Sequence, residues 1–368
     1  MHLKKIFKNK RVIVTGHTGF KGSWLTAWLK LLGADVMGIS LNPPTYPSHF
    51  KVSKINKKIK DIRLDIRNKN KIEKKIILFK PDFVFHLAAQ SLVGLSYEKP
   101  LMTWQTNVFG TLNILNSLRK LKKSCNVVIV TSDKCYFNKE VHYGYRETDI
   151  LGGNDPYGAS KASAELLVKS FINSFFSKKN KSKVRIATAR AGNVIGGGDW
   201  AKNRIIPDCV RCWSKGNSAN LRNPKATRPW QHVLEAVGGY ICLAANLKFN
   251  KKIHGESFNF GPNLSKEYSV LELVKKMSIH WNDVSWKTVP KSKAKFKESK
   301  LLRLNCNKAK KILKWQSILK FEETVEMVSN WYSNFYKNST NIGNFTNEQI
   351  KKYAFLTNTR GLKWGKKF

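Results

Sequence analysis

The stretch VIVTGHTGFKGSWLTAWLKLLGADVMGISLNPP, residues 12–44, decides the fold. It begins with β-branched residues that favour a strand, and three glycines then fall within seven positions. Apolar residues follow at helical spacing, and a second strand-like run ends in two prolines. A strand, a tight turn, a helix and a second strand within about thirty residues predict a βαβ unit.

The glycine spacing in this turn predicts a dinucleotide-binding site, because the pattern GxxGxxG lies between a strand and a helix. Glycine lets the backbone turn sharply and approach a pyrophosphate closely. The start of the helix adds unpaired N–H groups and a partial positive charge. A glycine-rich connection without a ligand is the alternative. The turn residues expected to contact the cofactor are Gly16, Thr18, Gly19, Phe20 and Gly22.

The end of the second strand lacks the acidic residue that usually binds the adenosine ribose of a dinucleotide. No Asp or Glu occurs between residues 36 and 60, and Asn42 stands where the acid is expected. An asparagine can hydrogen-bond the ribose without a charge. No arginine follows the strand either, so we expect NAD rather than NADP. Asp65 is either a partner of the adenine or a surface acid.

Strand-like and helix-like segments alternate as far as about residue 195. Apolar runs predict buried strands at 82–88, 125–132 and 184–196, and helical patterns cover 103–121 and 156–176. Asp155 is the expected N-cap of the last helix, with Pro156 at its first position. This alternation predicts an α/β fold with a doubly wound parallel sheet, the Rossmann arrangement.

Beyond about residue 196 the regular pattern gives way to loop-rich, charged segments. We therefore expect three parts: a Rossmann domain over 1–192, a smaller substrate-binding lobe over 193–337, and a polar tail over 338–368. The polar composition of the tail suggests that it is only loosely attached.

The charge balance is strongly basic, with 67 Lys and Arg against 24 Asp and Glu, a formal net charge of +43. The lysines are spread from end to end, and no zinc finger, RNP sequence or arginine-rich arm occurs. We therefore expect no nucleic-acid partner. A positive field would instead attract a phosphorylated substrate.

Targeting and redox signals are weak. No run of 18 apolar residues predicts a membrane helix, and the basic N-terminus runs straight into a strand, so we expect a cytoplasmic protein. Six cysteines in such a protein are expected to be reduced thiols. The lone CxxC formed by Cys209 and Cys212 is interpreted as ordinary packing, and no metal site is expected.

A second motif indicates the chemistry. Tyr157 and Lys161 lie four positions apart on one helix, so they share a face. An ammonium beside a phenol favours the phenolate and lowers its pKa, which would make Tyr157 a usable base near neutral pH. Ser132 ends the preceding strand and can hydrogen-bond a substrate hydroxyl. Asn107 lies on the intervening helix, where its amide is expected to hold a water or a backbone kink.

These motifs resemble those of the extended short-chain dehydrogenase/reductases that act on nucleotide sugars. HTGFKGSW at 17–24 and SDKCY at 132–136 are similar to the family of CDP-glucose 4,6-dehydratases, and the resemblance covers about residues 8–335. It implies NAD as cofactor and CDP-glucose as substrate. It also implies a homodimer that packs through the helices near 103–121 and 156–177. From the sequence HLAAQ, it implies further cofactor contacts at Leu87, Ala88 and Ala89.

The resemblance also implies roles in a 4,6-dehydration that yields CDP-4-dehydro-6-deoxy-D-glucose. Tyr157, helped by Lys161 and Ser132, would take the proton of the C4 hydroxyl. Asp133 would protonate the departing C6 hydroxyl. Lys134 replaces a glutamate of the related dTDP-glucose dehydratases and is the candidate base for C5, which requires a lowered pKa.

In the second lobe, the resemblance places Asn193, Arg204 and Arg228 near the CDP group, with a surface or salt-bridge role as the alternative for each. A guanidinium suits a pyrophosphate, and Arg228 fits that role best. Two other functions remain open. A nucleotide-sugar 4-epimerase would need Tyr157 and Lys161 but no acid–base pair at 133–134. A catalytically silent NAD-binding or nucleic-acid-binding protein would need neither.

Overall fold

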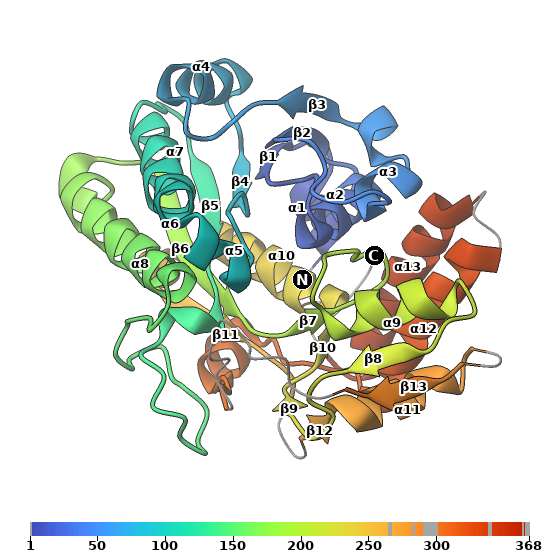
Figure 1. The fold of residues 1–368 in the computed structure, drawn as a ribbon. Coiled ribbons are helices and arrows are strands. Elements are labelled where there is room, and N and C mark those ends of the chain that lie inside the picture. The colour runs from blue at the N-terminus through green and yellow to red at the C-terminus, as the bar shows by residue number, and fades with distance from the viewer. Residues whose placement is uncertain are drawn as a thin grey trace.

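A computed structural model describes residues 2–263, 267–281, 284–289, 301–337, 341–362 and 364. At its centre lies a seven-stranded sheet in the order β11-β6-β5-β4-β1-β2-β3 (Figure 1). Every neighbouring pair in this sheet is parallel. The strands are β1 (Arg11–Thr15), β2 (Asp35–Ser40), β3 (Lys60–Arg63), β4 (Phe83–His86), β5 (Cys125–Val130), β6 (Val184–Ala191) and β11 (Ser257–Phe260).

The strand order reverses between β1 and β4, which confirms the expected doubly wound arrangement. In such sheets, ligands bind in the crevice outside the carboxyl ends of the strands at this switch point. The central strands β1, β4 and β5 are largely apolar and buried, because helices cover both faces of the sheet.

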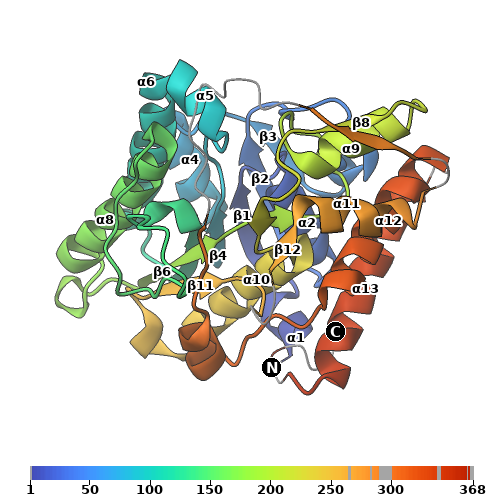
Figure 2. The ribbon, with the colours of Figure 1, turned by 60° about the horizontal axis from the view of Figure 1, so that its bottom comes forward.

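Helices lie on both faces of the sheet (Figures 1 and 2). On one face, α4 (Lys69–Phe79), α7 (Gly110–Arg119) and α8 (Pro156–Phe175) bury apolar side chains in a single cluster with the strands. On the other face, α2 (Phe20–Leu31) and α10 (Val233–Phe249) belong to the largest core cluster. Asp155 caps α8 as expected, because its carboxylate accepts a hydrogen bond from Gly158 N.

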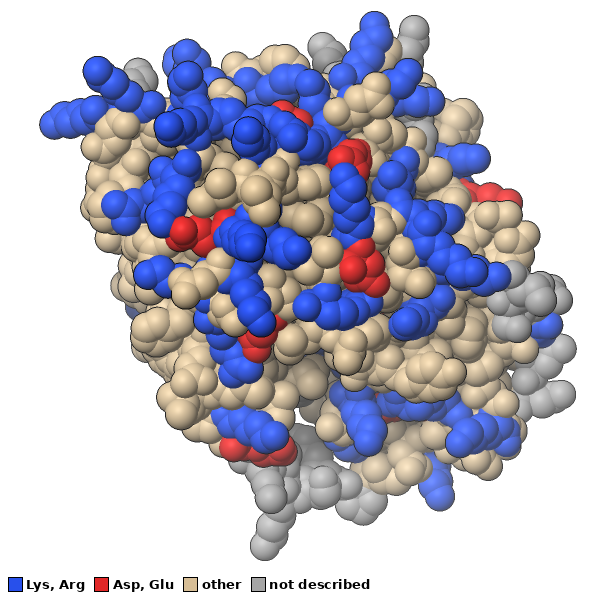
Figure 3. Space-filling view, turned by 90° about the horizontal axis from the view of Figure 1, so that it is seen from above, with Lys and Arg blue, Asp and Glu red and all other residues tan. Residues whose placement is uncertain are grey.

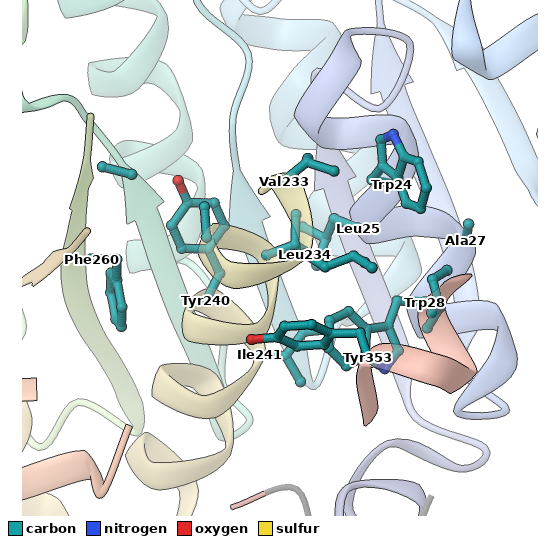
Figure 4. Close-up of a cluster of buried hydrophobic side chains, with 14 of the residues drawn as sticks. Trp24, Leu25, Ala27, Trp28, Val233, Leu234, Tyr240, Ile241, Phe260 and Tyr353 are labelled. Atoms are coloured by element: carbon teal, nitrogen blue, oxygen red, sulfur yellow. The ribbon is translucent and has the colours of Figure 1, made fainter. Parts of the chain in front are cut away.

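The core between α2 and α10 is rich in large side chains (Figure 4). Trp24 and Trp28 of α2 are fully buried, and Tyr353 meets Trp28 edge to face at 5.6 Å between ring centroids. Tyr353 also donates a hydrogen bond of 2.7 Å to the buried carboxylate of Glu235 on α10.

Tyr353 belongs to α13 (Ile342–Thr359), so the expectation of a loosely attached tail is wrong for this helix, which makes up most of the tail that the structure describes. The apolar residues of α13 are spaced to bury one face, against α2 and against α12 (Phe321–Lys337). The polar composition of residues 338–368 gave no indication of this apolar helix face. The division at residue 192 is also not a clean one, because β11 and α10 come from beyond it and complete the sheet layer.

The smaller lobe consists of short elements beside the carboxyl ends of the strands. Three short strand pairs, β10–β7, β12–β9 and β13–β8, brace it. Its elements are β7 (Val194–Ile195), α9 (Ile205–Trp213), β8 (Ala219–Leu221), β9 (Thr227–Arg228), β10 (Gln231–His232), β12 (Tyr268–Ser269), α11 (Val270–Ser278) and β13 (Trp286–Thr288). Cys209 and Cys212 are free thiols on α9, and Cys209 is part of the core.

The other helices are short segments that connect these layers. They are α1 (Leu3–Phe7), α3 (His49–Val52), α5 (Val93–Glu98), α6 (Pro100–Trp104) and the 3₁₀ or π turns η1 (Ile55–Lys58), η2 (Gln105–Phe109), η3 (Asp133–Cys135), η4 (Lys178–Asn180), η5 (Lys251–Ile253) and η6 (Ala309–Leu313). Among the described helices, none has both the length and the hydropathy to cross a bilayer.

Candidate active site

The glycine turn closes tightly after β1, and two of its positions admit only glycine. Gly16 has φ +76°, and a Cβ there would lie 2.7 Å from Ala88 N. At Gly22 a Cβ would lie 2.1 Å from Gly16 O. Gly19 is the N-cap of α2. A side chain would therefore fill the concave turn that a pyrophosphate needs, and the backbone fits the predicted dinucleotide site.

Residues at the ends of the neighbouring strands β2 and β4 lie beside this glycine turn. Thr18 Oγ1 lies 2.8 Å from Ser40 Oγ, at the end of β2. After β4, the N–H groups of Leu87 and Ala88 donate to the carbonyl and hydroxyl oxygens of Thr15, at 3.1 and 3.2 Å. The predicted contact residues of the glycine turn and of the segment 87–89 therefore lie on one rim of the sheet.

At the end of β2, Asn42 is exposed, in the place expected for a ribose contact. Asp65, the other candidate there, forms an ion pair of 2.6 Å with Arg67. That guanidinium lowers the pKa of Asp65, so the carboxylate stays ionised. Whether either residue contacts the cofactor stays a prediction.

Asn107 connects the segment after β4 to α8. Its Oδ1 accepts from Gln90 N at 2.8 Å, and its Nδ2 donates to Gln90 O at 3.0 Å and to Ser160 Oγ at 2.8 Å. It lies in the π-helical turn η2, which interrupts the helix between α6 and α7. Asn107 therefore lies where the regular helix is interrupted, as the expected backbone kink requires, and its role stays a prediction.

The predicted catalytic residues come together where β5 ends against the first turns of α8. Ser132, Asp133, Tyr157 and Lys161 are all buried, whereas Lys134 is half-buried. Ser132 Oγ donates to Asp133 Oδ1 at 2.9 Å and also hydrogen-bonds the phenol of Tyr157. One hydroxyl therefore links the proposed acid and the proposed base.

The expected lowering of the Tyr157 pKa is wrong. Burial raises the pKa of Tyr157 to about 12, and the hydrogen bond with Ser132 and the charge of Arg204 offset this only in part. Burial also lowers the pKa of Lys161 to about 8, with help from the charge of Lys21. Desolvation is the largest cause of both shifts in this closed site.

The pKa of the Asp133 carboxyl lies above that of an exposed aspartic acid. Burial raises its pKa, although the charges of Lys134 and Lys21 and the Ser132 hydroxyl oppose the shift. A Cβ on Gly192 would lie 3.0 Å from Asp133 Oδ2, so the glycine leaves room for this carboxyl. A carboxyl that holds its proton more readily is suited to act as an acid.

The sequence reasoning missed Lys21, which lies in the first turn of α2. Burial and the charge of Arg204 lower its pKa to about 8, although the side chain keeps some exposure. A lysine at the start of a helix opposes the helix dipole, and this misplaced charge is the signal that could have identified it.

The sequence reasoning also missed a buried ion pair beneath the catalytic residues. Glu165 on α8 pairs with Arg190 on β6 at 2.9 Å, and both side chains are 3% exposed. Glu165 also accepts hydrogen bonds from Thr131 and Thr188. Its position, four after Lys161 on the same helix face, was the available signal.

The three substrate residues predicted in the smaller lobe lie at different places. Arg204 occupies the N-cap position of α9, donates to Asp199 Oδ2 at 2.7 Å, and its charge acts on Tyr157. Asn193 lies between β6 and β7, and its carbonyl accepts from Gln231 N. Arg228 on β9 borders a cavity of about 330 Å³. The structure therefore places Arg204 close enough for its charge to act on Tyr157. Substrate roles for Asn193 and Arg228 stay predictions.

Comparison with known proteins identifies relatives along most of the chain. The model of the GDP-mannose 4,6 dehydratase family matches residues 13–328. CDP-glucose 4,6-dehydratase of Salmonella typhimurium is 44% identical over 332 residues, which are 89% of this chain and 92% of that protein.

Solved structures share the fold. An epimerase from Methanothermobacter thermautotrophicus matches with a TM-score of 0.75 and 22% identity, over 95% of this chain and 96% of that one. UDP-glucuronic acid 4-epimerase from Bacillus cereus, solved with UDP-glucuronic acid and NAD, matches with a TM-score of 0.72 and 20% identity, over 89% of this chain and 100% of that one. Together with the cofactor rim and the group around Tyr157, these matches show that the chain belongs to the GDP-mannose 4,6 dehydratase family, among the nucleotide-sugar dehydratases and epimerases.

Proposed function

We propose that the protein is an NAD-dependent lyase that converts CDP-glucose into CDP-4-dehydro-6-deoxy-D-glucose, a step of deoxysugar biosynthesis. The observation that carries this proposal is the buried Asp133 carboxyl, which Ser132 connects to Tyr157. An epimerase has no use for an acid at this place, whereas a dehydratase needs one to expel a hydroxyl. The 44% identity to a CDP-glucose 4,6-dehydratase supports the same reaction and substrate.

The cofactor would be held by the glycine turn of residues 16–22, by the segment 87–89 and by Lys161. Bound NAD supplies the acceptor for the hydride of C4 and later the donor of a hydride to C6. The chain's task is to orient the sugar, exclude water and move protons. Water is excluded because the side chains at this place are buried, namely Ser132, Asp133, Tyr157 and Lys161.

Tyr157 takes the proton of the C4 hydroxyl through hydrogen bonds shared with Ser132. The phenolate that forms is stabilised by the charge of Arg204. The ammonium of Lys161, one helical turn along α8, is proposed to add to this stabilisation. Because burial raises the Tyr157 pKa in the protein alone, these cations are required for the base to work near neutral pH.

Once C4 is a ketone, the C5 proton becomes acidic, and water leaves from C5 and C6. Asp133 gives its proton to the departing C6 hydroxyl, a role that its raised pKa favours. Lys134, next to Asp133 and half-buried, is our candidate for the base that removes the C5 proton. The ammonium that forms would return a proton to C5 when C6 receives its hydride. Arg204, Asn193 and Arg228 are proposed to contact the CDP group.

The test is to incubate the protein and NAD with the CDP, dTDP, GDP and UDP forms of glucose. A 4-keto sugar develops ultraviolet absorbance in alkali, which reports the product. We expect absorbance with CDP-glucose and little with the others. A sugar that is inverted at C4 and keeps its C6 hydroxyl would instead establish an epimerase.

We also propose that the protein is a homodimer, paired through the helices near 103–121 and 156–177, that is α6, η2, α7 and α8, which are neighbours in the fold. Apolar side chains of this region are unusually exposed, and contiguous exposed apolar surface marks an interface. The exposed fractions are 69% for Leu101, 36% for Trp104, 56% for Phe109 and 56% for Leu166.

Light scattering during gel filtration would test this pairing. We expect a dimer for the parent and a monomer for the double variant Leu101→Glu, Leu166→Glu. Leu78 on α4 is 67% exposed and lies outside the patch, so Leu78→Glu is the matched control and should stay dimeric. A monomeric parent, or a dimer that tolerates the double variant, would rule out this interface.

A further inference from the structure

The carboxyl end of β3 brings a guanidinium to the end of β2, where the sequence showed no arginine. Ser40 and Arg63 are partners in the parallel ladder of these strands. Arg63 Nη1 donates to Leu41 O at 3.0 Å, the residue directly before Asn42. Strand pairing therefore places a cation at the point where a dinucleotide presents its adenosine ribose.

The Arg63 side chain is held in place. Nη2 donates to Asp61 Oδ2 at 2.7 Å, and the guanidinium carbon lies 5.1 Å from the ring centroid of Phe50. Asp61 is also fixed by the ring of His17 at 2.8 Å. The side chain of Arg63 is nevertheless 32% exposed. A guanidinium has five N–H donors, so Arg63 keeps donors beyond these two bonds for a ligand.

The surroundings suit a phosphate better than those of a usual NAD pocket. A carboxylate at the end of β2 would repel a phosphate on the ribose, but here the residue is the neutral, exposed Asn42. Directly after Asn42, the segment 43–46 and Lys51 border a cavity of about 370 Å³. The end of β2 thus offers an arginine held by Asp61. Lys51, which follows the Phe50 that Arg63 stacks on, adds a second cation beside a cavity.

We propose that the cofactor pocket also binds NADP, with Arg63 donating hydrogen bonds to the 2′-phosphate. A planar guanidinium is the side chain best matched to a phosphate group. The proposal rests on the proposed function only in taking the glycine turn as the dinucleotide site. It does not depend on which sugar nucleotide is the substrate.

The test measures the dissociation constants of NAD and NADP by calorimetry without substrate. For the parent, we expect the two constants to agree within about tenfold. Arg63→Met should weaken NADP by at least about tenfold, the loss expected for a charge-assisted hydrogen bond, and change NAD by less than about twofold. Arg63→Lys should recover part of the loss, because it restores the charge without the fork geometry.

Two further variants sharpen the result. Lys60 lies on the same strand at its other end and pairs with Asp35, so Lys60→Met removes an equal charge without touching the ribose site. It should leave both constants unchanged. Asn42→Asp should tighten NAD and weaken NADP, because a carboxylate accepts from the ribose hydroxyls and repels the phosphate. Adenosine 2′,5′-bisphosphate compared with 5′-AMP should repeat the Arg63 effect without the nicotinamide half.

Three results would overturn the proposal. One is a parent that binds NADP more than about a hundredfold less tightly than NAD. The second is an Arg63→Met variant with unchanged NADP affinity. The third is an equal loss of NAD and NADP in that variant, which would mean that Arg63 only shapes the pocket. Failure of the dehydratase assay affects none of these, because no sugar nucleotide is used.

Discussion

Tyr157 shows how a single residue depends on its surroundings. Its ring is buried, and its pKa in the protein alone is far from neutral. We predict that Tyr157→Phe keeps the affinity for CDP-glucose, because the ring keeps its packing, and lowers kcat by about 10² to 10⁴, the usual effect of losing a general base. Steady-state kinetics and a binding titration test this. A kcat within about twofold of the parent would remove Tyr157 from the role of base.

Lys161 gives a pH dependence of stability with a defined sign. Its pKa is lowered to about 8 in the folded protein, against about 10.5 for a free lysine. Between these values the unfolded chain binds more protons, so this residue makes the free energy of unfolding rise with pH. We predict that the urea midpoint rises less from pH 8 to pH 10 in Lys161→Met than in the parent. Equal rises would show that Lys161 is not desolvated.

Asp133 and Lys134 separate a dehydratase from an epimerase. In Asp133→Asn the C5 base remains but the acid is lost, so we predict that deuterium from solvent enters C5 while no water is expelled. In Lys134→Met neither should occur, and both variants should accumulate reduced nicotinamide. Nuclear magnetic resonance of the recovered sugar measures the exchange. Exchange at the parental rate in Lys134→Met would assign the base to another group.

At the scale of elements, one carboxylate ties the helix that carries Tyr157 to the strands that carry its partners. Glu165 of α8 bonds Thr131, directly before Ser132, and pairs with Arg190, two positions before Gly192. The Tyr157, Asp133 and Gly192 segments are therefore held by one buried group.

We predict that Glu165→Gln lowers the free energy of unfolding by about 3–5 kcal/mol, because Arg190 would remain charged and buried without its partner. Adding Arg190→Met should recover a large part of this loss. Urea denaturation measures both. Asp35→Asn breaks an exposed pair with Lys60 and should cost no more than about 1 kcal/mol. A small effect of Glu165→Gln would mean that water or a shift of the helix relieves Arg190.

The same scale explains what the sequence could and could not predict. The unit β1–α2–β2 and the cap of α8 depend on neighbours in the chain, and both were predicted. The placement of β11 beside β6 and of Arg63 beside Leu41 depends on pairing between distant segments. The pKa of Tyr157 depends on burial by the whole fold, which spacing along the chain does not contain.

At the scale of the whole molecule, the excess of positive charge is the dominant electrostatic feature. Figure 3 shows Lys and Arg outnumbering acidic residues over one face of the protein. With a net charge of +43, repulsion among surface cations opposes the compact state. Surface ion pairs such as Lys120 with Glu73 offset only a small part of it.

Salt should therefore stabilise this protein. Raising the salt concentration from about 0.01 M to about 0.1 M shortens the screening length from about 30 Å to about 10 Å. Repulsion between distant lysines therefore fades before the attraction within close ion pairs does. We predict that the thermal midpoint rises over this range. Lys71 and Lys74 are exposed on α4, and replacing both with Glu should raise the midpoint at low salt and flatten its dependence on salt. Lys71→Gln with Lys74→Gln, which removes the charges without adding new ones, should give about half the effect. A midpoint that falls as salt is added would mean that attractive pairs outweigh the repulsion, in spite of the net charge.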